Sequence, residues 1–302
     1  MLSAKPWKAD AIARLTLSVF VCVFAGSVLV SVQHFVSAGG KASATLFYPL
    51  AVAALGCLAT TLVLLSKPWP PENLSRRLLT LMVCAYSGLF LGAWVQQASG
   101  VAGAESSIWR VVVASLSFQG AALILIARFL HEHQIRLAEA FGFANRRGKA
   151  VLMGILVALF FIPLGYWLQV LSMLVMTHLP YFKVEPQEQL PVHVLRVSMS
   201  WPGRITLGAA AVLLAPPAEE ILFRGVLYPA IKQAGFPRLA LWVSTLLFAV
   251  VHWNAPTFVP LAVLALVLTA LYERTDNLLA PITAHAVFNA VGLVWMLLFE
   301  HA

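Results

Sequence analysis

The chain has 302 residues, of which 61% are hydrophobic and only 11% charged, whereas a soluble domain carries about 25% charged residues. This composition excludes a soluble globular enzyme and indicates an integral membrane protein. The net charge of +8 does not indicate a nucleic-acid partner, because most of the basic residues stand in short connections beside apolar runs, where they orient helices against anionic lipid headgroups.

Long apolar runs predict an all-α fold, a polytopic membrane helix bundle with eight or nine transmembrane helices. A run of about 20 apolar residues crosses the hydrocarbon core as a helix. The candidate runs cover residues 13–36, 45–66, 77–97, 108–130, 150–178, 204–232, 238–253, 257–273 and 279–299. The first run is too long for the apolar part of a signal peptide. We therefore expect it to be a retained signal anchor, with cleavage after Ala38 as the alternative.

The charges of the connections alternate along the chain. One set is basic and includes Lys5, Lys8, Lys67, Arg76, Arg77, Arg136, Arg146, Arg147 and Lys149. The intervening set contains Lys41, Glu105, Glu185 and Glu188. Since basic loops stay on the cytoplasmic side, we expect a cytoplasmic N-terminus, in a pattern that suits a bacterial inner membrane. The polar loop 180–202 is expected to form an external cap or a mobile gate.

The predicted domain organisation has three parts. Residues 1–130 are N-terminal transmembrane helices with almost no ionisable residues inside the spans. Residues 131–149 place Leu137, Phe141 and Phe143 among charges, which predicts a cytoplasmic amphipathic helix on the membrane surface. Residues 150–302 contain ionisable residues inside apolar sequence, so chemistry is expected in this part.

The sixth apolar run contains two adjacent glutamates, Glu219 and Glu220, followed by Arg224. A charge inside hydrocarbon costs at least about 2.5–3.5 kcal/mol, so such groups face a bundle interior or a water-filled cavity. Glu220 and Arg224 are four residues apart and are expected to pair on one helix face. Glu219 points about 100° away from that face and is the better candidate for a general base. The alternative is that both glutamates only neutralise Arg224.

Two further residue pairs follow, and each has the spacing that puts both residues on one helix face. The first is Phe248 with His252, and the second is His285 with Asn289. Folding the helices on either side of residues 235–237 into an antiparallel hairpin brings His252 to the depth of Glu219. If that hairpin is fully buried, however, His252 and His285 lie on opposite sides of the membrane. Each pair alone is also explained by packing between helices.

The three motifs, Glu219-Glu220 with Arg224, Phe248 with His252, and His285 with Asn289, resemble in type and order those of the CPBP intramembrane protease family. This family groups CAAX prenyl endopeptidases with bacterial Abi proteins, and the resemblance covers roughly residues 137–299. It implies an intramembrane endopeptidase that cleaves a peptide or protein substrate, either prenylated at a CAAX sequence or bearing a leader. The implied catalytic residues are Glu219, which activates water, His252, which assists it, and His285 with Asn289, which stabilise the oxyanion. Glu220, Arg224 and Phe248 are the supporting residues.

Several alternatives stay open from the sequence. Glu219, His252 and His285 suit a zinc ion in principle, but we favour metal-independent catalysis because no HExxH motif is present. The nearest approach, His131-Glu132-His133, has Ile135 where the second ligand is needed. A noncatalytic membrane scaffold or immunity-type protein is the main rival, and a proton-coupled transporter is a weaker one, because the first half has no counterpart of the polar second half.

Overall fold

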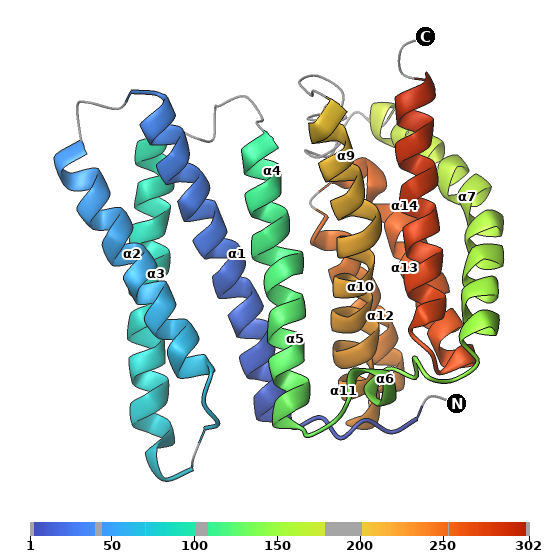
Figure 1. The fold of residues 1–302 in the computed structure, drawn as a ribbon, viewed down its shortest axis with the longest axis horizontal. Coiled ribbons are helices and arrows are strands. Elements are labelled where there is room, and N and C mark those ends of the chain that lie inside the picture. Colours follow the sequence, from blue (N-terminus) through green and yellow to red (C-terminus); the bar gives the residue numbers. More distant parts are fainter. Residues whose placement is uncertain are drawn as a thin grey trace. The chain divides into compact units, whose positions relative to one another are not determined.

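The computed structural model describes residues 3–39, 44–69, 71–100, 108–178, 201–252 and 254–299. Within these ranges the secondary structure is entirely helical, and eight helices are long and apolar enough to cross a membrane (Figure 1). The predicted all-α polytopic bundle is therefore confirmed, and the chain is an integral multi-pass membrane protein. The loop predicted at 180–202 lies, up to residue 200, outside the described residues, as do Lys41, Glu105, Glu185 and Glu188.

The chain divides into two compact units. The small unit comprises residues 8–129, and the large unit comprises residues 1–7 and 130–302. The small unit contains the helices α1 (Ala9–Ser37), α2 (Ala44–Leu65), α3 (Leu74–Ser99) and α4 (Ile108–Ser115), and α5 (Ala121–Glu132) up to residue 129, with the π-helical turn η3 (Leu116–Gly120) between the last two.

Two glycines of α3 allow close helix packing in the small unit. A Cβ atom on Gly88 would lie 2.8 Å from the Leu58 side chain on α2. A Cβ atom on Gly92 would lie 2.6 Å from the ring of Phe24 on α1. The GxxxG spacing of these glycines therefore serves helix packing, as small residues do in membrane helices.

The large unit is built around one long interrupted helix and four further long helices. The interrupted helix consists of α9 (Trp201–Ala209), the π-helical turn η4 (Ala210–Leu214), α10 (Ala215–Glu220), the π-helical turn η5 (Ile221–Leu227) and α11 (Tyr228–Gln233). The others are α7 (Arg147–His178), α12 (Pro237–Val250), α13 (Ala255–Thr275) and α14 (Leu279–Phe299), preceded by the single turn α6 (Leu137–Ala140).

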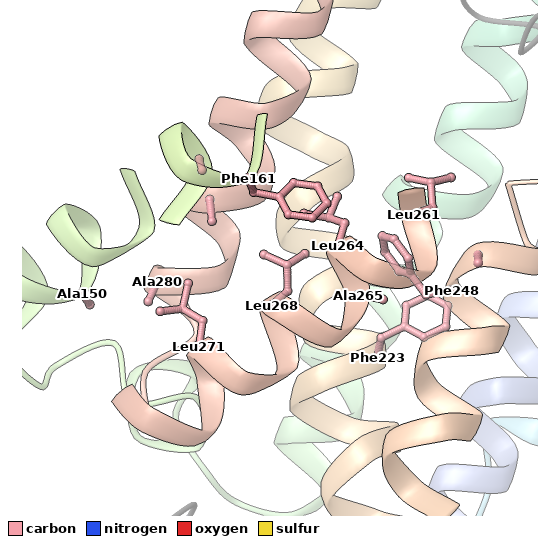
Figure 2. Close-up of a cluster of buried hydrophobic side chains, with 13 residues drawn as sticks. Ala150, Phe161, Phe223, Phe248, Leu261, Leu264, Ala265, Leu268, Leu271 and Ala280 are labelled. Carbon is pink, nitrogen blue, oxygen red and sulfur yellow. The ribbon is translucent and has the colours of Figure 1, made fainter. Parts of the chain in front are cut away.

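The core of the large unit lies along α13. Leu261, Leu264, Leu268 and Leu271 of this helix are buried among side chains from α7, η5, α12 and α14 (Figure 2). The helices α7 and α14 approach closely at Gly154, where a Cβ atom would lie 2.5 Å from the Ala280 carbonyl oxygen. This packing fixes α13 and α14, which contribute to the candidate site.

Segment 131–149 differs from the amphipathic helix that the sequence predicted. It contains the end of α5, the four-residue α6 and several turns before α7 begins. The backbone has positive φ at Gln134, Gly142 and Arg146, a left-handed conformation that interrupts a right-handed helix. Phe141 is fully buried inside the large unit. The apolar side chain therefore contributes to the protein core instead of lying on a membrane surface.

The candidate run 238–253 forms α12, which has 14 residues. At 1.5 Å per residue its length is about 21 Å, less than the hydrocarbon thickness of about 30 Å. This run is therefore a shorter apolar helix, and eight is the number of candidate spans in the described part of the chain.

Candidate active site

The two glutamates lie in a short α-helical segment between two π-helical turns. Glu219 and Glu220 end α10, with η4 before this helix and η5 after it. Pro216 and Pro217 stand at the start of α10, and neither has a backbone N–H to continue an α-helical ladder. The prolines thus explain the irregular hydrogen bonding of η4, and π-helical turns of this kind are frequent at functional sites.

Asn289 binds a carbonyl group that this irregular turn leaves available. In η4 the Ala215 N–H donates to the Ala210 carbonyl, five residues back. The same register would pair the Ala211 carbonyl with residue 216, a proline without an N–H. Instead, Asn289 Nδ2 on α14 donates to the Ala211 oxygen at 2.9 Å. The side chain predicted to stabilise an oxyanion therefore also connects α14 to η4.

Glu220 is the centre of a buried charge network. Its Oε1 atom accepts from Arg224 Nη1 at 2.8 Å and from His285 Nδ1 at 2.9 Å. Glu220 and Arg224 are both fully buried, and the pairing expected from their spacing is confirmed. Arg224 also donates to the Ala265 carbonyl at 3.2 Å, and its guanidinium lies 4.4 Å from the centre of the Phe248 ring. The carboxylate, guanidinium and imidazole therefore hold one another between η5, α13 and α14.

Glu219 faces both histidines. The distance from its Oε2 atom to His252 Nε2 is 3.9 Å, and the distance to His285 Nε2 is also 3.9 Å. Both distances exceed direct hydrogen-bond length. An oxygen atom about 2.8 Å from each partner fits between groups at this separation. The structure therefore brings the three residues to one place, and the arrangement with histidines on opposite membrane sides is wrong.

The Nδ1 atom of each histidine makes a hydrogen bond that fixes the orientation of its ring. His252 Nδ1 lies 2.7 Å from the Phe248 carbonyl oxygen, and His285 Nδ1 binds Glu220. A carbonyl and a carboxylate can only accept, so each Nδ1 carries a proton. In the neutral form of either imidazole, Nε2 is then an acceptor directed at Glu219. Each Nε2 becomes a donor only when its ring takes up a second proton.

Phe248 packs beneath these groups. Its ring is fully buried and lies 4.9 Å from the His252 ring and 5.7 Å from the His285 ring, centre to centre. Phe223 packs edge-on against it at 5.4 Å, and Figure 2 shows the two phenyl rings together. The supporting role predicted for Phe248 thus has a physical basis in contacts with Arg224 and both imidazoles.

Several contacts at the site were not predicted. The hydroxyl of Thr269 lies 3.5 Å from Arg224 Nε, and the carbonyl groups of Ala265 and Ala211 accept from Arg224 and Asn289. Thr269 is one hydroxyl residue in an apolar run, and backbone carbonyls leave no mark on a sequence. Only the described helix packing identifies these partners.

The three residues considered for zinc are not arranged as a set of metal ligands. Ligand atoms bound to tetrahedral zinc at 2.0–2.2 Å lie about 3.3–3.5 Å apart. The two distances from Glu219 Oε2 to the imidazoles are both 3.9 Å. Among the described residues, no group of three histidine, cysteine, aspartate or glutamate side chains is placed to hold a metal ion. The residues as placed do not fit zinc.

Comparison with known proteins gives a family-model match and partial matches to curated relatives. Residues 201–291 match the family model described as type II CAAX prenyl endopeptidase Rce1-like. The uncharacterized protein YpbD of Bacillus subtilis (strain 168) is 37% identical over 93 residues, 30% of this chain and 44% of that protein. The UPF0177 protein YaiF of Lactococcus lactis subsp. lactis (strain IL1403) is 31% identical over 111 residues, 35% of this chain and 47% of that protein.

The matched part of the chain spans less than half the length of each of these relatives. No solved structure matches the chain. The family model nevertheless covers every residue of the three motifs, from Glu219 to Asn289. The chain is thus similar, over residues 201–291, to the type II CAAX prenyl endopeptidases of the Rce1-like family, and the resemblance drawn from its motifs is confirmed.

Proposed function

We propose that the protein is an intramembrane endopeptidase in which Glu219 activates a water molecule for attack on a peptide bond. The observation that carries the proposal is the convergence of two imidazole Nε2 atoms on one glutamate oxygen, at 3.9 Å each. A water molecule between these groups has a base on one side and hydrogen-bonding nitrogens on the others. The similarity to type II CAAX prenyl endopeptidases supports the same reaction class.

The proposed reaction has two steps. Glu219 takes one proton from the water molecule, whose oxygen forms a bond to the carbonyl carbon of the substrate. The carbon–nitrogen bond then breaks, and the departing amine takes the proton from Glu219, either directly or through His252 Nε2. Proton transfer by positioned side chains of this kind contributes about 10²- to 10⁴-fold to a rate. No covalent acyl-enzyme forms.

Negative charge develops on the carbonyl oxygen during the first step. Asn289 uses one amide hydrogen on the Ala211 carbonyl and keeps the second for this oxygen. His285 donates from Nε2 only when its ring is doubly protonated, because Nδ1–H is directed at Glu220. His285 Nε2 faces Glu219, on the side of the ring opposite the Nδ1 atom that binds Glu220.

The test of the proposal is a cleavage assay on the full chain in liposomes. Suitable substrates are membrane-anchored peptides offered in matched pairs, with and without a prenyl group, together with a leader-bearing precursor. We expect cleavage at one peptide bond, with one oxygen from isotopically labelled water in the new carboxylate. If no substrate is cleaved, and Glu219→Gln binds a partner protein as well as wild type does, the results would instead support a noncatalytic scaffold. The member of each pair that is cleaved faster identifies the substrate class.

The proposed reaction does not use a metal ion, and this gives a further prediction. We expect 1,10-phenanthroline and EDTA to leave the cleavage rate within about twofold of the untreated rate, because the steps above use only side chains. The purified active protein should contain much less than one equivalent of zinc by elemental analysis. If a chelator abolishes activity and added zinc restores it, the attacking water is bound to zinc and is not activated by Glu219 alone.

We further propose that the protein resides in a bacterial inner membrane with its N-terminus in the cytoplasm. The basic connections predicted to face the cytoplasm support this orientation. The partners in this proposal are membrane lipid and a peptide or protein substrate.

A further inference from the structure

The first residues of the chain pack against the large unit. Residues 3–7, called the N-terminal strap below, are not helical and belong to that unit. The Lys5 ammonium is buried and donates to the Ala140 carbonyl at 2.9 Å, with Asp276 Oδ1 3.9 Å away. Ser3 donates to the same Asp276 oxygen at 3.1 Å. Burial lowers the pKa of Lys5, and Asp276 partly offsets this effect.

A second set of contacts fixes the backbone of the strap. With its amide oriented to suit its neighbours, Gln233 accepts from the Lys5 N–H at 2.7 Å and donates to the Lys5 carbonyl at 2.9 Å. The strap therefore lies beside α6 and the end of α11, as its trace in Figure 1 also shows. These bonds present Trp7, the last residue of the strap, to the interrupted helix.

Trp7 binds the residue next to Arg224. Its indole Nε1 donates to the Gly225 carbonyl at 3.0 Å, and Gly225 lies in η5. In an α-helix this carbonyl would accept from residue 229, four positions on. Residue 229 is Pro229, which has no N–H. In the α-helical register Pro229 offers no N–H to this carbonyl, and Trp7 donates to it from outside the helix.

The residues around Gly225 leave no space for a side chain at this position. A Cβ atom at this position would lie 2.7 Å from the Phe141 ring. Trp7 packs edge-on against His133 at 5.4 Å and lies 6.2 Å from Phe141, centre to centre. Gly225 thus lies against the Phe141 ring of the 131–149 segment, and Trp7 of the strap binds its carbonyl group.

We infer that Trp7 is a positioning residue that holds the π-helical register of η5 and so keeps Arg224 on Glu220. A π-helical turn contains about one residue more than an α-helical turn. Conversion to α-helix would rotate the following side chains by about 100° relative to Glu219 and Glu220. This inference rests on the proposed function only for its effect on turnover, since the geometry itself is independent of the reaction.

The first test compares Trp7→Phe with wild type in the full chain. Phenylalanine keeps an aromatic ring against His133 and Phe141 but removes the N–H. We expect kcat to fall about tenfold with KM within about twofold, because misplaced catalytic groups lower turnover more than binding. The matched control is Trp167→Phe on an exposed part of α7, which should leave both constants unchanged.

A second variant tests the helical register itself. Pro229→Ala adds a backbone N–H that can donate to the Gly225 carbonyl in the α-helical register. With Trp7 in place we expect kcat of Pro229→Ala within about threefold of wild type, whereas the double variant Trp7→Phe with Pro229→Ala should lose more than the two single losses combined, a non-additive result expected of donors that share one partner. Wild-type kcat in Trp7→Phe, or a double variant that loses no more than the two single losses combined, would overturn the inference.

A spectroscopic readout keeps this inference separate from the proposed activity. In protein labelled with ¹⁵N at histidine, the Nδ1 resonance of His285, assigned with His285→Gln, reports its hydrogen bond to Glu220. We expect Trp7→Phe to shift this resonance and the double variant with Pro229→Ala to shift it further, even if no substrate is cleaved. An unchanged resonance in Trp7→Phe contradicts the positioning role. If the His285 resonance shifts as expected but neither wild type nor any variant cleaves a substrate, only the proposed reaction is contradicted.

Discussion

Replacing Glu219 with glutamine is expected to abolish peptide-bond cleavage while the protein remains folded. Glutamine has nearly the same shape but cannot accept the proton of the attacking water, so we expect a loss of about 10²- to 10⁴-fold in kcat. Glu219 is buried and faces both imidazoles. The measurement is the initial rate in liposomes, combined with thermal unfolding in detergent to show that the fold is retained.

Glu273→Gln is the matched control for that experiment. Glu273 also lies in the large unit and is partly buried, but it binds Tyr228 and Lys232 instead of the histidines. We expect this variant to retain the wild-type cleavage rate within about twofold, as is usual for a change outside the catalytic groups. Wild-type turnover in Glu219→Gln would exclude Glu219 as the base.

Replacing Arg224 with methionine is expected to destabilise the protein more than any single change at the site. Methionine fills a similar volume but leaves the fully buried Glu220 carboxylate without its guanidinium partner. Removal of one member of a buried ion pair typically costs about 3–5 kcal/mol. We expect the unfolding temperature in detergent to drop sharply and the yield of folded protein to fall.

Removing both charges identifies the cause of that loss. In the double variant Glu220→Gln with Arg224→Met, no unpaired charge remains at this position, so we expect about half or more of the lost stability to return. Activity should not return, because His285 has also lost the carboxylate that holds its Nδ1. An Arg224→Met variant as stable as wild type would show that the pair contributes nothing to the fold.

The membrane spans were predictable because a helix in lipid must satisfy all its backbone groups internally and needs about 20 apolar residues. The run at 238–253 was ambiguous because a largely apolar run of 16 residues suits either a short span or a buried helix. Its form as α12 depends on packing against α11 and α13, which the sequence does not display. The prediction of an amphipathic helix over 131–149 was wrong because the sequence pattern around Phe141 is the same whether its side chain lies in lipid or in the protein core.

At the site, motif spacing predicted the Glu220–Arg224 pair because both residues lie on one continuous helix face. The convergence of Glu219, His252 and His285 depended on how deeply the hairpin sits, and three separate motifs in one region made a shared place the better interpretation. The π-helical turns could not be predicted, since prolines at 216, 217 and 229 are compatible with several kinds of irregular turn. The contribution of Trp7 was hidden by its distance of more than 200 residues along the chain.

The end of α12 has a consequence for how the site is assembled. The last carbonyl groups of a helix have no partner within that helix, and each needs a donor. One of those donors is His252, whose Nδ1–H binds the Phe248 carbonyl. The ring that caps the helix end is thereby held in the tautomer that directs Nε2 at Glu219. The hydrogen bond that caps the end of α12 therefore also orients the imidazole toward Glu219.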